Sequence, residues 1–140
     1  MYVLVCVIIL FASVKVFNRS SVNSTGAFEW KKQVAVYFVD LNKVKTSDCE
    51  ADVPVFKTII NAETLGPGAI EALIKDSAVG GEKSYYSAIN KDTLLQKFEI
   101  KDKVAYVDFN SNLNKGVAGS CNVIAIRSQI EKTLVNMPDI

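Results

Sequence analysis

The 140-residue chain contains no histidine. This absence removes the commonest general base, the commonest zinc ligand and the usual pH-sensing side chain. Lysine and arginine number 16 and aspartate and glutamate 15, so the formal net charge is only +1. Nucleic-acid-binding domains usually carry a clustered excess of positive charge. The composition therefore argues against a nucleic-acid partner and offers no support to a histidine-dependent enzyme.

Cysteine is scarce as well, and the three residues of this type are Cys6, Cys49 and Cys121. Cys121 stands directly before a predicted helix, and a helix N-terminus lowers the pKa of a thiol. A catalytic cysteine still needs a proton acceptor, which is usually histidine. Two thiols without histidine also leave a four-ligand zinc site half empty. A thiol enzyme using Cys121 is thus a weak alternative, and no residue pattern indicates a metal or a cofactor.

The longest uncharged run is MYVLVCVIILFASV, over residues 1–14, and Lys15 interrupts it before Val16 and Phe17. The run is shorter than the about 20 apolar residues that a membrane helix needs. No basic region precedes it, as one would in a secretory signal. We interpret residues 1–17 as a membrane anchor or signal-like segment whose true start lies upstream. The alternative is a buried strand or helix of a soluble fold.

Residues 18–32 are rich in Ser, Asn and Thr and are predicted to link this segment to a domain over residues 33–140. Because an export-like segment precedes the domain and oxidising compartments preserve disulfides, we expect Cys49 and Cys121 to form one. Two unpaired, buried cysteines are the alternative. The basic residues that follow the apolar run, Lys15, Arg19, Lys31 and Lys32, would instead place the domain in the cytoplasm by the positive-inside rule.

β-Branched and aromatic residues predict strands over residues 33–40 and 53–60, and Pro54 favours an edge position for the second. Pro67 and helical spacing predict a helix over 67–76. Residues 93–100 and 103–110 flank Lys101-Asp102 and predict a hairpin.

Apolar residues recur every three or four positions and predict a second helix over 122–136, with Asn122 as its N-cap and Arg127 paired with Glu131. The predicted core residues of this helix are Val123, Ile126, Ile130, Leu134 and Met137. The order of elements indicates an α+β fold with two helices packed on one face of a mixed or antiparallel sheet.

The run GSCNVIAIRSQIEKTLVNMPDI, with VAYVDFN before it and AIEALIKD upstream, resembles the GerMN domain family. This family is named for a spore-germination protein and occurs in bacterial envelope proteins. The resemblance covers residues 33–140, and the cysteine pair is similar to an envelope-anchored subset. It implies an α+β domain like the ring-building modules of envelope complexes, without catalytic residues. Members end in a further strand after the proline, so we expect the last strand to be missing at Ile140 and a sheet edge to be unpaired.

The leading hypothesis is a domain without enzyme activity that is tethered to a bacterial cell membrane through residues 1–17. It would lie on the extracytoplasmic side and contact other envelope proteins. A module that binds cell-wall glycan or a small ligand is the second hypothesis. Trp30, Tyr85 and Tyr86 are its aromatic candidates, although the tyrosines are expected to pack between helix and sheet. Asp108 and Asn110 end a strand, and we expect them to cap a turn.

Overall fold

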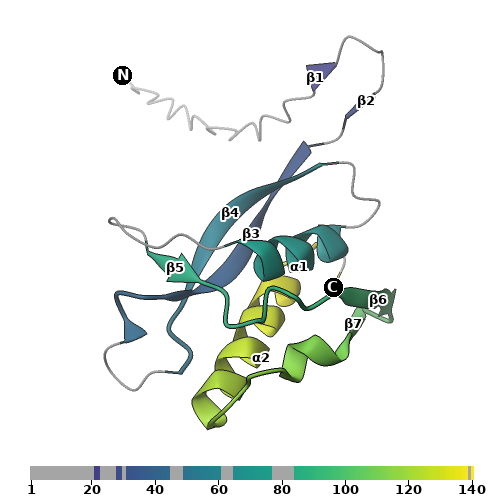
Figure 1. Ribbon diagram of the computed structural model, residues 1–140. Coiled ribbons are helices and arrows are strands. Elements are labelled where there is room, and N and C mark those ends of the chain that lie inside the picture. The colour runs from purple at the N-terminus through teal and green to yellow at the C-terminus, as the bar shows by residue number, and fades with distance from the viewer. Residues whose placement is uncertain are drawn as a thin grey trace, which may run out of the picture.

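The computed structural model describes residues 21–22, 28–29, 31–44, 49–60, 65–76, 84–138 and 140. The predicted anchor over residues 1–17 and the indole of Trp30 lie outside these ranges. Within them the elements, in chain order, are β1 (Ser21–Val22), β2 (Phe28–Glu29), β3 (Lys31–Asp40), β4 (Asp52–Ile60), α1 (Leu65–Lys75), β5 (Tyr85–Tyr86), β6 (Leu95–Lys101), β7 (Val104–Phe109), the short 3-10 helix η2 (Ser111–Asn114) and α2 (Ser120–Val135) (Figure 1).

β3 is the central strand of a three-stranded antiparallel sheet and lies between β4 and β5. β4 follows it along nearly its whole length, whereas β5 pairs with it only at Val39 and Asp40. Successive residues of a strand point to opposite faces. Val34, Val36 and Phe38 therefore share one face, and all three are buried.

Both helices cover this buried face. Ile70 and Leu73 of α1 and Ile126 and Leu134 of α2 join the β3 side chains in one apolar core. The predicted α+β fold with both helices on one sheet face is confirmed. β4 is an edge strand, which accommodates Pro54 as the sequence predicted.

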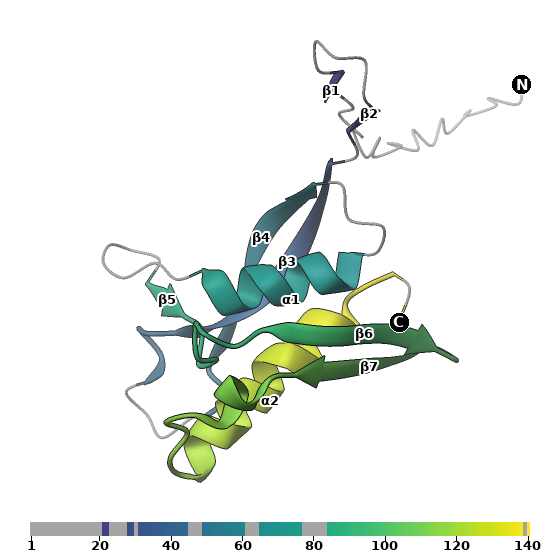
Figure 2. The same cartoon turned by 45° about the vertical axis from the view of Figure 1, so that its right-hand side comes forward.

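The β6–β7 hairpin forms a second antiparallel sheet, separate from the first, and packs against the helices (Figure 2). Phe98, Val107 and Phe109 of the hairpin contact the common core. The Phe98 ring lies so close to Gly66 of α1 that a Cβ there would collide with it. The glycine thus permits the close approach of α1 and β6.

The turn of this hairpin lies at Asp102-Lys103, one residue later than predicted. Both residues have positive φ, 53° and 62°. Two positive φ angles are typical of the type I′ turn, whose twist matches that of the flanking strands. The right-handed twist of the hairpin thus decides the turn, even though neither residue is glycine.

Three features differ from the predictions: two concern α2, and the third concerns the predicted linker. The helix begins at Ser120, with Gly119 at the N-cap and a φ of 82°, so the prediction of Asn122 as N-cap was wrong. Val123 is 55% exposed and is not a core residue. The helix instead buries Ser128, Gln129 and Thr133, because polar groups of neighbouring segments face it there. β3 begins at Lys31, inside the predicted linker, which also contains β1 and β2.

Among the described residues no strand follows α2. β7 pairs with β6 alone, so its second edge carries no strand from the described part of the chain. On β3, part of the edge opposite β4 is covered by a helix, because the backbone N–H of Tyr37 donates to the Thr133 hydroxyl of α2 at 3.0 Å. Among the described residues a helix thus covers part of one strand edge, whereas no strand pairs with the second edge of β7.

Candidate functional site

The two cysteines outside the N-terminal segment meet in space. Cys49, in the turn before β4, and Cys121, in the first turn of α2, are joined as a disulfide with their Cα atoms 5.0 Å apart. This Cα separation lies within the usual range for disulfides. A cavity of 330 Å³ beside them is lined by further residues: Val39, Val44, Tyr86, Ala118, Asn122 and Ala125. Bonded in this way, neither sulfur is available as a thiolate nucleophile.

A buried carboxylate lies near the disulfide, at the start of β4. The side chain of Asp52 is 1% exposed, and its Oδ2 atom is 2.9 Å from Lys132 Nζ. The same oxygen accepts a hydrogen bond of 2.5 Å from the Ser128 hydroxyl. The other oxygen, Oδ1, is buried without a protein hydrogen-bond partner. Asp52 thus connects β4 to two successive turns of α2.

Gln129 serves as a polar connection in the interior. Its side chain is fully buried, with Oε1 accepting from the Ala88 N–H at 2.8 Å. Its Nε2 donates to the Tyr86 carbonyl at 3.2 Å. The irregular segment after β5 thereby obtains partners for backbone groups that burial would otherwise leave unpaired. These contacts hold that segment against α2, and the apolar periodicity of the helix does not reveal them.

The Tyr85 side chain is held by contacts with β3, β4 and the residue that follows α1. Its ring lies 4.7 Å from the Phe38 ring, centroid to centroid. Its hydroxyl accepts from Lys57 Nζ at 3.0 Å and donates to Asp76 Oδ2 at 3.4 Å. Lys57 and Asp76 also form an ion pair, which joins β4 to the end of α1. As expected, Tyr85 packs between the helix and the sheet, and its hydroxyl is held by Lys57 and Asp76.

The other candidate residues have separate locations. Tyr86 is half-buried beside Gln129, and nothing is described of Trp30. The side-chain oxygen of Asn110 accepts a hydrogen bond from the Leu94 N–H at 3.0 Å. The backbone N–H of Asn110 donates to the Leu94 carbonyl at 3.1 Å. Asn110 stands at the N-cap position of η2, but its side chain makes no capping hydrogen bond there, so the turn-capping prediction was wrong for this residue. It was also wrong for Asp108, which lies within β7 opposite Lys97, because the strand runs past it to Phe109.

Two surface ion pairs raise the pKa of their basic members. Arg127 and Glu131 pair as predicted, with Nε and Oε1 2.6 Å apart, and this hydrogen bond raises the pKa of the guanidinium. On β6, the hydrogen bond and charge of Glu99 raise the pKa of Lys97, with a smaller contribution from Asp108. Both basic groups are solvent-exposed, and such pairs add little to stability.

The edge of β7 that faces away from β6 borders a hollow on the described surface. This groove of 700 Å³ lies between β7 and α2, and Ile140 is among the residues that line it. Its apolar lining consists of Val104, Ala105, Val107, Phe109, Ile130, Leu134, Val135 and Ile140. Val135 is 69% exposed. No feature of the sequence singles out this groove, because it combines residues of a strand and a distant helix.

Within the described residues no three His, Cys, Asp or Glu side chains gather in a way that would hold a metal ion. None of the described helices has both the length and the apolar character needed to cross a membrane. The groove beside β7 is one candidate for an interaction site, and the disulfide is a covalent constraint that joins the turn before β4 to α2.

Comparison with known proteins identifies one family. The model of the Germane family, described as "Sporulation and spore germination", matches residues 35–140. No curated protein and no solved structure matches the chain. The matched region extends from β3 to residue 140 and covers more than half of the sequence, in agreement with the resemblance to GerMN domains. The chain therefore belongs to the Germane family of sporulation and spore-germination domains.

Proposed function

We propose that the chain is a membrane-tethered domain on the extracytoplasmic side of a bacterial cell membrane, where it helps to assemble envelope proteins and performs no catalysis. Residues 1–17 would be the tether, and the domain from β3 onward would be the interacting part. Family membership supports a role linked to sporulation or germination.

The observation that carries the location is the cysteine pair. Cys49 and Cys121 are 72 residues apart in the sequence, yet their Cα atoms are only 5.0 Å apart. Disulfides persist in oxidising compartments and are rare in the cytosol. We therefore propose that the bond forms in the native protein after export of the domain.

The proposed absence of catalysis rests on the environment of the candidate groups. The sulfur of Cys121 is bonded to Cys49, and the chain has no histidine to act as its base. The buried carboxylate of Asp52 is paired with Lys132 and bonded to Ser128, both on α2. A glycan-binding role is not favoured by any specific contact, since the hydroxyl of Tyr85 is already engaged by Lys57 and Asp76.

The location is tested by reporter fusions after Ile140 in bacterial cells. Alkaline phosphatase should be active there and green fluorescent protein dark, because the first needs an oxidising compartment and the second does not fluoresce when exported unfolded. Removing residues 1–17 should reverse both readouts. Bright fluorescence of the full chain, with inactive phosphatase, would show that the domain remains in the cytoplasm, as the basic flank of the apolar run suggests.

A further inference from the structure

We propose that the outer face of the paired strands β3 and β4 docks on the surface of the membrane that holds the chain. Phe56 and Ile60 enter the layer of lipid headgroups, and Lys32 at the rim contacts anionic lipid. This face, here named the ribbon face, consists of Lys31, Gln33 and Ala35 of β3 and Phe56, Thr58 and Ile60 of β4. The proposal rests on the proposed membrane tether and specifies how the tethered domain is oriented.

Alternation along β4 separates a buried face from an exposed one. Ile59 is 9% exposed and packs so closely on α1 that a Cβ at Gly68 would collide with its side chain. Successive residues of a strand point to opposite faces, so Phe56, Thr58 and Ile60 point away from α1. Phe56 is 69% exposed and Ile60 is 49% exposed. β4 thus holds two large apolar side chains in water on a face that α1 does not cover.

β3 adds positive charge to the ribbon face and no carboxylate. The register of the two strands pairs Lys31 with Ile60, Gln33 with Thr58 and Ala35 with Phe56. Lys31 and Lys32 are both exposed at the start of β3. Attachment to a lipid interface becomes stronger with buried apolar area and with attraction between basic groups and anionic headgroups. The ribbon face offers both contributions.

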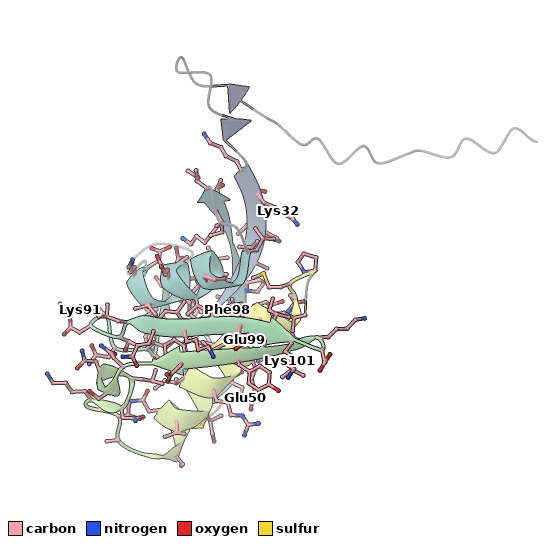
Figure 3. All side chains as sticks on the ribbon, turned by 90° about the vertical axis from the view of Figure 1, so that its right-hand side faces the viewer. Lys32, Glu50, Lys91, Phe98, Glu99 and Lys101 are labelled. Atoms are coloured by element: carbon pink, nitrogen blue, oxygen red, sulfur yellow. A yellow bond between two sulfur atoms is a disulfide. The ribbon has the colours of Figure 1, made fainter. Side chains whose placement is uncertain are left out.

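The start of β3 is held close to the proposed tether. β1 and β2 pair with each other, so the chain returns at residue 29 to the neighbourhood of residue 21. Residue 17 and Lys31 are therefore at most about 27 Å apart, even with the remaining residues fully extended. Figure 2 shows the ends of β3 and β4 next to β1 and β2, extending beyond α1, and Figure 3 shows Lys32 on this part of β3.

A lipid surface fits the ribbon face better than an added protein strand. The backbone N–H of Tyr37 points away from β4, toward Thr133, so Pro54 opposite it turns its nitrogen to the edge of β4 that no described strand pairs with. Proline has no N–H, so a strand added at this edge would lack one hydrogen bond. The strand expected after Ile140 would start in the groove beside β7, whereas the ribbon face points away from α1.

The test uses the full chain in vesicles of phosphatidylcholine and phosphatidylglycerol. Trp30→Phe removes the single tryptophan, and Phe56→Trp places one in the ribbon face. Lipids brominated at the upper part of the acyl chain should quench the fluorescence of this variant. The matched control carries Val123→Trp instead, at a position that is 55% exposed in the first turn of α2, at the opposite end of the molecule (Figure 2). Its fluorescence should not be quenched.

Substitutions measure the two contributions through the docked fraction, which is read from the quenching. Lys32→Gln should lower the docking constant about fivefold, the contribution of one lysine beside an anionic surface. Ile60→Ser should lower it by roughly the same factor, because about half of an isoleucine side chain leaves water on docking. Lys115→Gln, an exposed lysine just before α2, is the control and should leave the constant unchanged.

Several results would overturn the proposal. These are absence of quenching at position 56, equal quenching at positions 56 and 123, and a docking constant that does not change in Lys32→Gln. A blue shift without quenching that grows with protein concentration would assign the ribbon face to a second copy of the chain. Flotation of the vesicles separates the two proposals. A chain that floats with the vesicles but is not quenched contradicts docking alone, whereas a chain that does not float contradicts the tether as well.

Discussion

Removal of the disulfide should produce a large and calculable loss of stability. Cys49 and Cys121 are 72 residues apart, and the bond closes that loop in the unfolded chain. In the chain-entropy treatment a loop of this length corresponds to about 4 kcal/mol at 25 °C. For a domain of this size, that loss should lower Tm by roughly 15–20 °C.

The measurement is thermal unfolding of the full chain by circular dichroism, with and without reductant. The double variant Cys49→Ala, Cys121→Ala should melt near the temperature of the reduced protein, because both lack the same constraint. Reductant should leave the Tm of this double variant unchanged. This measurement on the double variant excludes an effect of reductant on Cys6, which both proteins retain.

A decrease of only a few degrees on reduction would refute this reasoning, because it would mean that the unfolded chain is not restricted by the bond or that the bond is absent. A double variant much less stable than the reduced protein would point instead to the packing of the sulfur atoms. The two measurements therefore separate chain entropy from local contacts.

Four further substitutions test the interior, each by chemical denaturation. Lys132→Met should lower the free energy of unfolding by about 3 kcal/mol, because it leaves the carboxylate of Asp52 buried without its cation. Asp52→Asn should lower it by only about 1–2 kcal/mol, because Lys132 is 39% exposed and can reach water. Gly66→Ala should destabilise by about 1–2 kcal/mol, because its new Cβ collides with the Phe98 ring. Gln129→Leu should cost about 2–4 kcal/mol, because it leaves the Ala88 N–H and the Tyr86 carbonyl without partners.

Matched changes serve as controls for these substitutions. Glu71→Ala breaks the exposed pair with Lys75 and should change stability by less than about 0.5 kcal/mol. Phe98→Leu in the Gly66→Ala background should recover part of the loss by relieving the collision. Equal costs for Lys132→Met and Asp52→Asn would contradict the role assigned to burial, and a stabilising Gly66→Ala would show that the hairpin moves away freely. A neutral Gln129→Leu would mean that water replaces the amide.

Much of the fold could be predicted from local patterns. The strand over residues 33–40 has a β-branched core face, and the helix over 67–76 has a proline in its first turn. Both lie within one or two residues of β3 and α1 as observed. The hairpin was predicted because two apolar runs flank two polar residues, and its register followed once the twist of the strands selected a turn with positive φ at Asp102 and Lys103.

The interior of α2 could not be predicted in this way. Apolar periodicity favours Val123 as a core residue, but the helix is rotated so that Gln129 and Thr133 face the centre. That rotation depends on distant partners, since Thr133 bonds the N–H of Tyr37 and Gln129 bonds the segment after β5. Hydrogen-bonding needs of distant segments outweigh the local pattern, and no single window of sequence contains them.

The groove beside β7 could not be predicted from the sequence, for a related reason. It consists of a strand edge and a helix face more than 20 positions apart in the chain, and only the tertiary arrangement brings Val107 and Ile130 together. The family resemblance did indicate an unpaired sheet edge. It did not indicate which edge remains open or that apolar residues of α2 lie beside it.

If the domain is exported as proposed, the spacing of the cysteines also sets the timing of oxidation during biosynthesis. A chain threaded out of the cell from its N-terminus exposes Cys49 well before Cys121, which follows 72 residues later. At synthesis speeds of about 5–20 residues per second, this interval lasts on the order of 4–14 s. During that time Cys6, which precedes Cys49 in this sequence, has also been made. A membrane-embedded Cys6 would be unreachable for Cys49, so insertion of the apolar run would protect the chain from an incorrect bond until α2 emerges.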